Sequence, residues 1–187
     1  MSRKHHVMLD IETLDSSDTA AVVSIGAVKM NYSTLEISEE YQCIFSDLDG
    51  QLELGRTKNE DTMKWWANLP THASEPLFYP ELFGEILRTT KEGLTELSEF
   101  CKNCYVWGYG SMFDNVIIRS IMRDYSVKPL WHYRDDMCAR TLINVFPMAS
   151  NIPRVGTHHN ALDDARTQMN WLREIIITKD LPIRYME

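Results

Sequence analysis

The sequence predicts an α/β fold in which helices cover a mixed central sheet. Three β-compatible runs come first, over 6–11, 20–30 and 40–45, and are expected to form an antiparallel meander. Helical and strand patterns alternate after them. A short apolar strand over 104–109 then passes through a Gly-rich turn into a helix over 113–125, which is typical of a parallel crossover. Strands first and alternation afterwards together favour a mixed sheet.

Capping residues and apolar spacing predict the other elements. Asp61 and Thr62 are expected to cap a helix that ends near Asn68. The apolar residues of 80–103 have spacings that suit two helices broken near Gly93. The remaining predicted elements are an edge strand over 131–138, a short helix over 139–146 and a long helix over 161–177.

The composition is that of a folded protein. The chain has 187 residues and a mass of 21.8 kDa, the size of one ordinary domain, so we expect a single domain over 1–187. Hydrophobic residues make up 44% of it, which excludes a disordered chain. The sequence has no apolar run of about eighteen residues and no signal-peptide pattern, and its four cysteines are too few for a disulfide framework. We therefore expect a cytoplasmic protein with no membrane partner.

The net charge limits the kind of partner. The chain carries 27 acidic and 19 basic residues, which gives a formal net charge of -8. This balance excludes a basic protein that coats a nucleic-acid duplex. It does not exclude nucleic acid, because a site that holds divalent cations presents positive charge locally.

Two acids lie close together in the first predicted strand. Asp10 and Glu12 are two residues apart, so both carboxylates lie on the same face of the sheet. Side-by-side acids cost free energy unless a cation or solvent compensates them. Taken alone, the pair is also compatible with an ordinary solvated strand face.

Further candidates lie at the starts of two predicted helices. Asp114 follows the strand over 104–109, where open α/β sheets place ligands, although an acid there also stabilises a helix through its dipole. Asp164 comes five positions after His159, which is not the i,i+4 spacing that puts two ligands on one helical face. This spacing suits a metal ligand, Asp164, on the helix and a histidine on the preceding loop. An exposed histidine pair and a capping aspartate are the alternative.

Four strings of this sequence together resemble a known family. LDIET, SIGAV, VWGYGSMFDNVIIRS and HHNALDDA resemble the motifs of the DEDDh group of 3′-5′ exonucleases, in the ribonuclease H-like superfamily. The resemblance spans 10–164 and is closest to a short subgroup of phage exonuclease A and mycobacterial exoribonuclease-like proteins. It implies a ribonuclease H-like fold. It also implies five catalytic residues, of which the four acids are metal ligands: Asp10, Glu12, Asp114, His159 and Asp164.

The resemblance implies a metal-dependent hydrolysis of phosphodiester bonds. Two cations, Mg²⁺ or Mn²⁺, would be held by the four acids, which are the ligand type that hard cations prefer. Two such ions promote deprotonation of water, neutralise charge at phosphorus and stabilise the leaving oxygen. His159 would act as general base, since it occupies the histidine position of the H-x-A-x-x-D signature. His158 lies one position too early to match.

The implied substrate is the 3′ end of a single nucleic-acid strand, which is shortened with release of nucleoside 5′-monophosphates. By the resemblance, Thr13 and Leu14 line the pocket of the terminal nucleotide. The aromatic candidates for stacking on bases are Trp65, Trp66, Trp107 and Phe113. Of these, Trp66 and Phe113 are the two expected to bind the substrate.

Three points stay open at this stage. DNA and RNA are both compatible with the subgroup. Related exonucleases include dimers, so a homodimer is compatible with the resemblance. A catalytically silent nucleic-acid-binding module on the same fold is the main alternative function, and a structural metal-binding domain is a third. The presence of all five motif residues argues against the silent module. A structural metal-binding domain would leave His159 without a role.

Overall fold

A computed structural model describes residues 4–147 and 151–181, and its centre is a six-stranded mixed sheet. The strand order is β4-β3-β2-β1-β5-β6. The first three strands pair antiparallel, whereas β5 is parallel to β1 and to β6, and β4 is parallel to β3. The predicted meander and crossover are confirmed. The strands are β1 (His6–Thr13), β2 (Val22–Met30), β3 (Ile37–Phe45), β4 (Leu87–Arg88), β5 (Tyr105–Gly108) and β6 (Asp136–Cys138).

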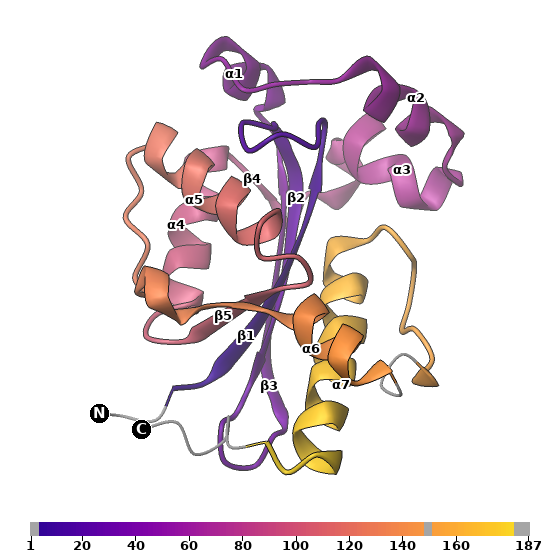
Figure 1. The fold of residues 1–187 in the computed structure, drawn as a ribbon. Helices are drawn as coiled ribbons and strands as arrows, with labels where there is room; N and C mark the ends of the chain where they lie inside the picture. Colours follow the sequence, from indigo (N-terminus) through magenta and orange to yellow (C-terminus); the bar gives the residue numbers. More distant parts are fainter. Residues whose placement is uncertain (1–3, 148–150, 182–187) are drawn as a thin grey trace.

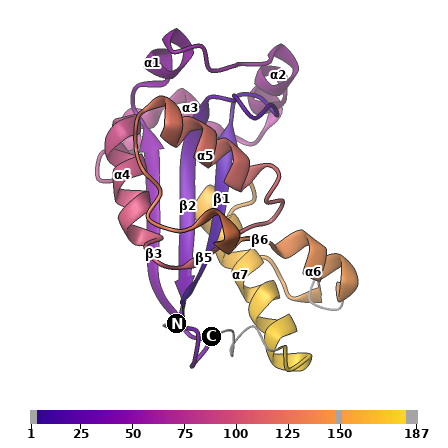
Figure 2. The ribbon, with the colours of Figure 1, turned by 60° about the vertical axis from the view of Figure 1, so that its left-hand side comes forward.

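Helices cover both faces of the sheet, as Figures 1 and 2 show. In Figure 1, α4 and α5 lie on one side of the strands, and α6 and α7 lie on the other. Three further helices, α1 to α3, gather at one end of β1 and β2. The helices are α1 (Leu48–Glu53), α2 (Glu60–Asn68), α3 (Thr71–Phe78), α4 (Thr90–Phe100), α5 (Asp114–Asp124), α6 (Ala139–Val145) and α7 (Ala161–Thr178), with 3-10 turns η1 (Pro80–Phe83) and η2 (Tyr133–Asp135).

The side-chain alternation of β1 separates two hydrophobic cores. Val7, Leu9 and Ile11 belong to the core under α4 and α5. Met8 points to the other face and belongs to the core under α6 and α7. Because strand side chains alternate, Asp10 continues on the face of Met8 and therefore lies on the side that α7 covers.

A glycine lets the start of α7 approach the sheet closely. Gly26 is the partner of Asp10 in the register of β1 and β2. A Cβ at Gly26 would lie 2.2 Å from the backbone carbon of Ala161, the first residue of α7, so no larger residue fits without a shift. This contact brings the N-terminus of α7 next to Asp10.

Several predicted boundaries are wrong. The break expected near Gly93 lies earlier, because β4 ends at Arg88 and Thr89 caps α4 through a capping box with Glu92. Gly93 lies inside α4, where a Cβ would come within 2.7 Å of the Phe45 ring. The side chain of Asn59, rather than Asp61 or Thr62, caps α2.

Two other elements differ from the sequence prediction. Only the last part of the predicted edge strand is β6, since η2 precedes it. Neither α1 nor α3 was predicted; neither has a side-chain cap, and α3 carries Pro76 in its interior. No helix in the described ranges is long and apolar enough to cross a membrane.

Candidate active site

All five predicted catalytic residues line one cavity. The cavity has a volume of about 400 Å³ and opens at the end of β1 between α5 and α7. Three segments that are distant in sequence supply these five residues: β1, the start of α5, and the loop and first turn of α7. The five residues are Asp10, Glu12, Asp114, His159 and Asp164.

Three of the acids form a compact group of oxygen ligands. One carboxylate oxygen from each of Asp10, Glu12 and Asp164 lies within 4.8 Å of the others. The group arises because β1 places Asp10 and Glu12 on one face and the close contact at Gly26 brings α7 over that face. Oxygen-only donors at this spacing fit hard divalent cations such as Mg²⁺ or Mn²⁺.

Asp114 faces the same cavity from the other side. It is the first residue of α5 and is buried, and its Oδ2 accepts the main-chain N–H of Gly110 at 3.2 Å. Because β1 and β5 are parallel neighbours, the chain that follows β5 comes out beside the end of β1. Asp114 is not part of the compact oxygen group, but it acts electrostatically on both Asp10 and Glu12.

The crowded carboxylates repel one another. Burial, with the charges of Asp164 and Asp114, raises the pKa of Glu12 to about 8. Burial and the charges of Asp114 and Glu12 raise the pKa of Asp10 well above its usual value. Burial also raises the pKa of Asp114 to about 6, although the Gly110 N–H opposes the shift. A bound cation would relieve this repulsion, so the acids fit the metal ions that the sequence implies.

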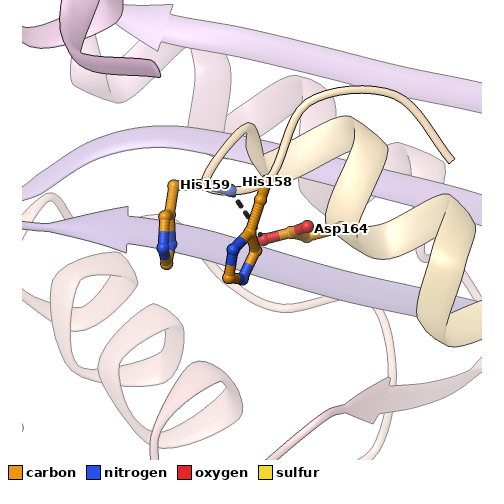
Figure 3. A group of neighbouring side chains, drawn as sticks. All are labelled: His158, His159 and Asp164. Carbon is orange, nitrogen blue, oxygen red and sulfur yellow. Dashed lines mark hydrogen bonds between the residues drawn. The ribbon is translucent and has the colours of Figure 1, made fainter. Parts of the chain in front are cut away.

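The loop before α7 holds His159 in an unusual backbone conformation. His159 has a φ of 66°, in the left-handed region that residues other than glycine rarely adopt. Its main-chain N–H donates to Oδ2 of Asp164 at 3.1 Å, drawn as the dashed line in Figure 3. Strained conformations of this kind often occur at functional sites.

Two rings flank the His159 imidazole. His158 stacks on it with 3.7 Å between ring centroids, and the Trp65 ring lies at 86° to it with 4.8 Å between centroids. Figure 3 shows the two imidazoles side by side, next to Asp164. Burial and the neighbouring His158 lower the pKa of His159, which favours its neutral form. His158, His159 and Asp164 also offer ligand atoms within 4.8 Å of one another, a second metal-compatible group that the sequence did not suggest.

Side chains of α7 hold this loop in place. Asp163 accepts the N–H of Thr157 at 2.8 Å, and Thr167 Oγ1 accepts the N–H of Val155 at 2.9 Å. Asp163, which does not match the family signature, therefore has a role in shaping the loop.

The predicted nucleotide-binding residues divide into two groups. Thr13 and Phe113 line a second hollow of about 420 Å³ next to the cavity, together with Trp65, which is 41% exposed. Trp66 is fully buried and its Nε1 donates to the carbonyl oxygen of Thr13, so the expectation that it stacks on a base is wrong. Leu14 is 3% exposed and packs in a small cluster with α1 and α3 residues, so its side chain does not reach a nucleotide.

The buried Trp107 is likewise excluded from stacking. Its Nε1 donates to Nδ1 of His6 within the core.

Sequence reasoning missed several residues that line the cavity. Gln168 Nε2 donates to Oδ1 of Asp10 at 2.7 Å, and its position four residues after Asp164 on one helical face was a usable signal. Arg154 forms an ion pair with Asp164. The remaining missed residues are Tyr109, Arg140 and Trp171. Arg140 and Trp171 lie outside the quoted motifs, so the sequence gives no signal for them. Tyr109 lies inside VWGYGSMFDNVIIRS, but its position there does not show that it faces the cavity.

The sequence matches one family model. A model described as the 3′-5′ exoribonuclease Rv2179c-like domain matches residues 5–176. Among curated proteins, none matches this chain significantly.

Solved structures with a similar fold are DEDDh exonucleases. The nuclease domain of 3′hExo, a DEDDh family member bound to rAMP, has a TM-score of 0.62 and 12% identity, and the match covers 95% of this chain and 93% of that chain. Exonuclease I from Methylocaldum szegediense has a TM-score of 0.64 and 12% identity, and the match covers 97% of this chain and 42% of that chain. Exonuclease I from E. coli in complex with a dA16 oligonucleotide has a TM-score of 0.60 and 11% identity, and the match covers 94% of this chain and 41% of that chain.

This chain therefore spans less than half the length of the exonuclease I chains. At such low identities the likeness concerns the fold, and it confirms the predicted ribonuclease H-like mixed sheet flanked by helices.

Proposed function

The chain belongs to the family of the 3′-5′ exoribonuclease Rv2179c-like domain and is a 3′-5′ exonuclease, and we propose that it shortens single-stranded RNA from the 3′ end. Each turnover would release one nucleoside 5′-monophosphate. The observation that carries the proposal is the meeting of five motif residues, from β1, α5 and the start of α7, in one cavity.

The acids are the proposed holders of two divalent cations. Asp10, Glu12 and Asp164 offer oxygens close enough to share an ion, and Asp114 faces the same cavity. When bound, such ions activate water, neutralise charge at phosphorus and stabilise the leaving oxygen. Each acid is held by a regular element: Asp10 and Glu12 by β1, Asp114 by α5 and Asp164 by α7.

His159 is the proposed general base. It takes a proton from the attacking water, whose oxygen forms a new bond to the terminal phosphorus as the bond to the 3′ oxygen of the preceding nucleotide breaks. That 3′ oxygen then takes a proton from solvent. Trp65 and His158 limit the movement of the imidazole from two sides, and the Asp164 contact fixes its backbone.

The hollow beside the cavity is the proposed pocket of the terminal nucleotide. Trp65 and Phe113 line it together with Thr13 and Glu12. An exposed indole provides a face on which any base can stack. A base in a duplex is already stacked and paired, which favours a single-stranded end.

Strand digestion tests the proposal. RNA and DNA, single- and double-stranded and labelled at either end, are incubated with the protein in Mg²⁺, in Mn²⁺ or in a chelator, and the products are sized. We expect mononucleotides and a ladder that shortens from the 3′ end of single-stranded RNA in the presence of metal only. Internal cuts, shortening from the 5′ end or activity in chelator would contradict the mechanism.

The same assay tests the choice of sugar. The family description supports RNA, whereas exonuclease I of similar fold is seen with DNA. Faster digestion of DNA than of RNA of the same sequence would overturn the substrate proposal and leave the exonuclease mechanism standing.

A further inference from the structure

One wall of the cavity carries two arginines on two aromatic rings. Arg140 Cζ lies 4.9 Å from the Tyr109 ring centroid, and Arg154 Cζ lies 5.7 Å from that of Trp171. The two rings are neighbours, with 6.0 Å between their centroids. These four residues, which we call the arginine–aromatic row, all line the cavity that contains the acids.

Arg140 acts electrostatically on Asp114 but forms no ion pair with any described residue. Within the described ranges 4–147 and 151–181, no acid lies at ion-pair distance from its guanidinium. Its main-chain N–H donates to the carbonyl of Tyr109, and a Cβ at Gly110 would lie 3.0 Å from Arg140 Nη2. The glycine therefore lets the guanidinium lie against the turn that precedes Asp114. An exposed arginine held there leaves its donors free for a ligand.

Arg154 lies at the other end of the row. Its guanidinium pairs with Asp164, so it reaches the acid group itself. Trp171 beneath it is fixed, since Nε1 donates to the carbonyl of Ile152 at 3.0 Å. Arg154 and Trp171 thus connect the loop before α7 to the wall of the cavity.

We propose that Arg140 and Arg154 form a phosphate-binding subsite that holds the last two phosphodiester groups of the strand. The inference rests on the proposed function, because it assumes a nucleic-acid strand in the cavity. A planar guanidinium offers paired donors that match phosphate oxygens. The aromatic faces beneath hold both side chains toward the cavity, which lowers the entropy lost on binding.

The position of the row indicates which part of the strand it binds. Trp65 and Phe113 line the hollow proposed for the terminal base. The row comes instead from the turn after β5, the start of α6, the loop before α7 and α7 itself. Both arginines approach the acids, where the reacting phosphate must lie. An acidic protein with net charge -8 needs such local positive groups to hold a polyanion, because its overall field repels one.

Strand binding without cleavage tests the subsite. The affinity of a short single-stranded RNA, labelled at its 5′ end, is measured by fluorescence anisotropy with Mg²⁺ in a His159→Ala background. We expect Arg140→Gln and Arg154→Gln each to weaken binding about tenfold, as loss of a charged hydrogen bond does. The slope of log affinity against log salt should become shallower by about 0.7 for each lost phosphate contact.

Arg134→Gln is the matched control, because Arg134 also lies over a tyrosine ring, that of Tyr133, but does not line the cavity. Its affinity and salt slope should equal those of the background protein. Arg140→Lys and Arg154→Lys keep the charge and should recover the salt slope. Unchanged binding in both glutamine variants, or no recovery in both lysine variants, would overturn the proposal.

Neutral methylphosphonate linkages locate the bound phosphates. Placed at either of the last two linkages, the substitution should weaken binding by the background protein and have little further effect in the arginine variants. An equal loss from a linkage far from the 3′ end would contradict the subsite. Cleavage by the wild-type protein is a separate readout, so failure of the proposed function is distinguishable from failure of this inference.

Discussion

The main-chain N–H of His159 donates a hydrogen bond of 3.1 Å to Oδ2 of Asp164. The proposed base and a proposed metal ligand are thus joined through backbone, independently of the imidazole. A change of the His159 side chain can therefore remove the ring while the contact to Asp164 persists.

We predict that His159→Ala lowers turnover by about 10²-fold to 10⁴-fold, the usual contribution of a positioned general base. Strand binding and metal binding should change little, because the acids stay in place. The measurements are single-turnover cleavage and anisotropy binding. His158→Ala, at the neighbouring position, is the control and should retain most of the activity. Loss of activity in His158→Ala but not in His159→Ala would show that His158, and not His159, is the base.

The four acids should make the melting temperature of the protein depend on divalent metal. Mg²⁺ or Mn²⁺ should raise the melting temperature of the wild-type protein, since the ions bind the folded site and not the dispersed acids of the unfolded chain. Asp10→Ala, Glu12→Ala, Asp114→Ala and Asp164→Ala should each abolish turnover and leave a folded protein. A variant lacking all four should show no metal-dependent rise. An equal rise in both proteins would locate the ions elsewhere.

The raised pKa of Glu12 predicts how stability depends on pH without metal. Its pKa is about 8 in the folded protein and about 4.5 unfolded, so the folded state holds more protons between these values. The free energy of unfolding should therefore fall as pH rises from about 4.5 to about 8, by up to about 1.4 kcal/mol per pH unit for this one proton. Urea unfolding in chelator measures the slope.

Two glutamine variants identify the source of that slope. Glu12→Gln removes one titrating group and should make the curve shallower between about pH 6 and 8, although Asp10, whose pKa is also raised, still contributes to it. Glu92→Gln is the control, because contacts with Thr89 lower the pKa of Glu92, which then titrates well below this range. A slope unchanged in Glu12→Gln would mean that another group titrates there.

The five catalytic candidates could be predicted from the sequence because acids and histidines in a fixed spacing indicate metal and acid–base chemistry. Periodicity indicates the strand that holds Asp10 and Glu12 and the helix starts near Asp114, His159 and Asp164. The resemblance to the exonuclease motifs implies their roles. Arg140 and Arg154 are different. Arginine is ordinary on an exposed surface, and only the folded chain shows that both lie over rings in the same cavity.

The tryptophan pair illustrates a second limit. Helical spacing indicates that one of Trp65 and Trp66 faces the core, but it does not say which one. The answer depends on the carbonyl of Thr13, which accepts the Trp66 indole N–H at 2.9 Å from a segment 53 residues away. The start of α4 is a different case, because a local signal was present. The capping box of Thr89 and Glu92 starts the helix there, and Gly93 inside the helix does not break it.

Gln168 should tune the metal site through Asp10. Its Nε2 donates to Oδ1 of Asp10, which orients that carboxylate. We predict that Gln168→Leu weakens Mn²⁺ affinity by about 10-fold to 100-fold, as loss of a partner of a ligand usually does. Titration of the melting temperature with Mn²⁺ measures this. Asn170→Ala, two residues further along α7, is the control. Equal metal affinity in Gln168→Leu would show that Asp10 needs no such partner.

Gly26 should control both stability and activity. A Cβ there would lie 2.2 Å from the backbone of Ala161, so Gly26→Ala must displace the start of α7 from β2. Overpacking of this kind costs about 1–3 kcal/mol or more, and the displacement carries Asp164 away from Asp10. We therefore expect a lower urea midpoint and a loss of turnover larger than the loss of stability explains.

Gly50→Ala is the control, because a Cβ in that helix meets no atom within 4 Å and alanine favours the helix. Gly50→Ala should be neutral or stabilising, by up to about 1 kcal/mol. A Gly26→Ala protein with normal turnover would show that α7 can shift without moving the ligand, and would separate the packing at Gly26 from the chemistry of the site.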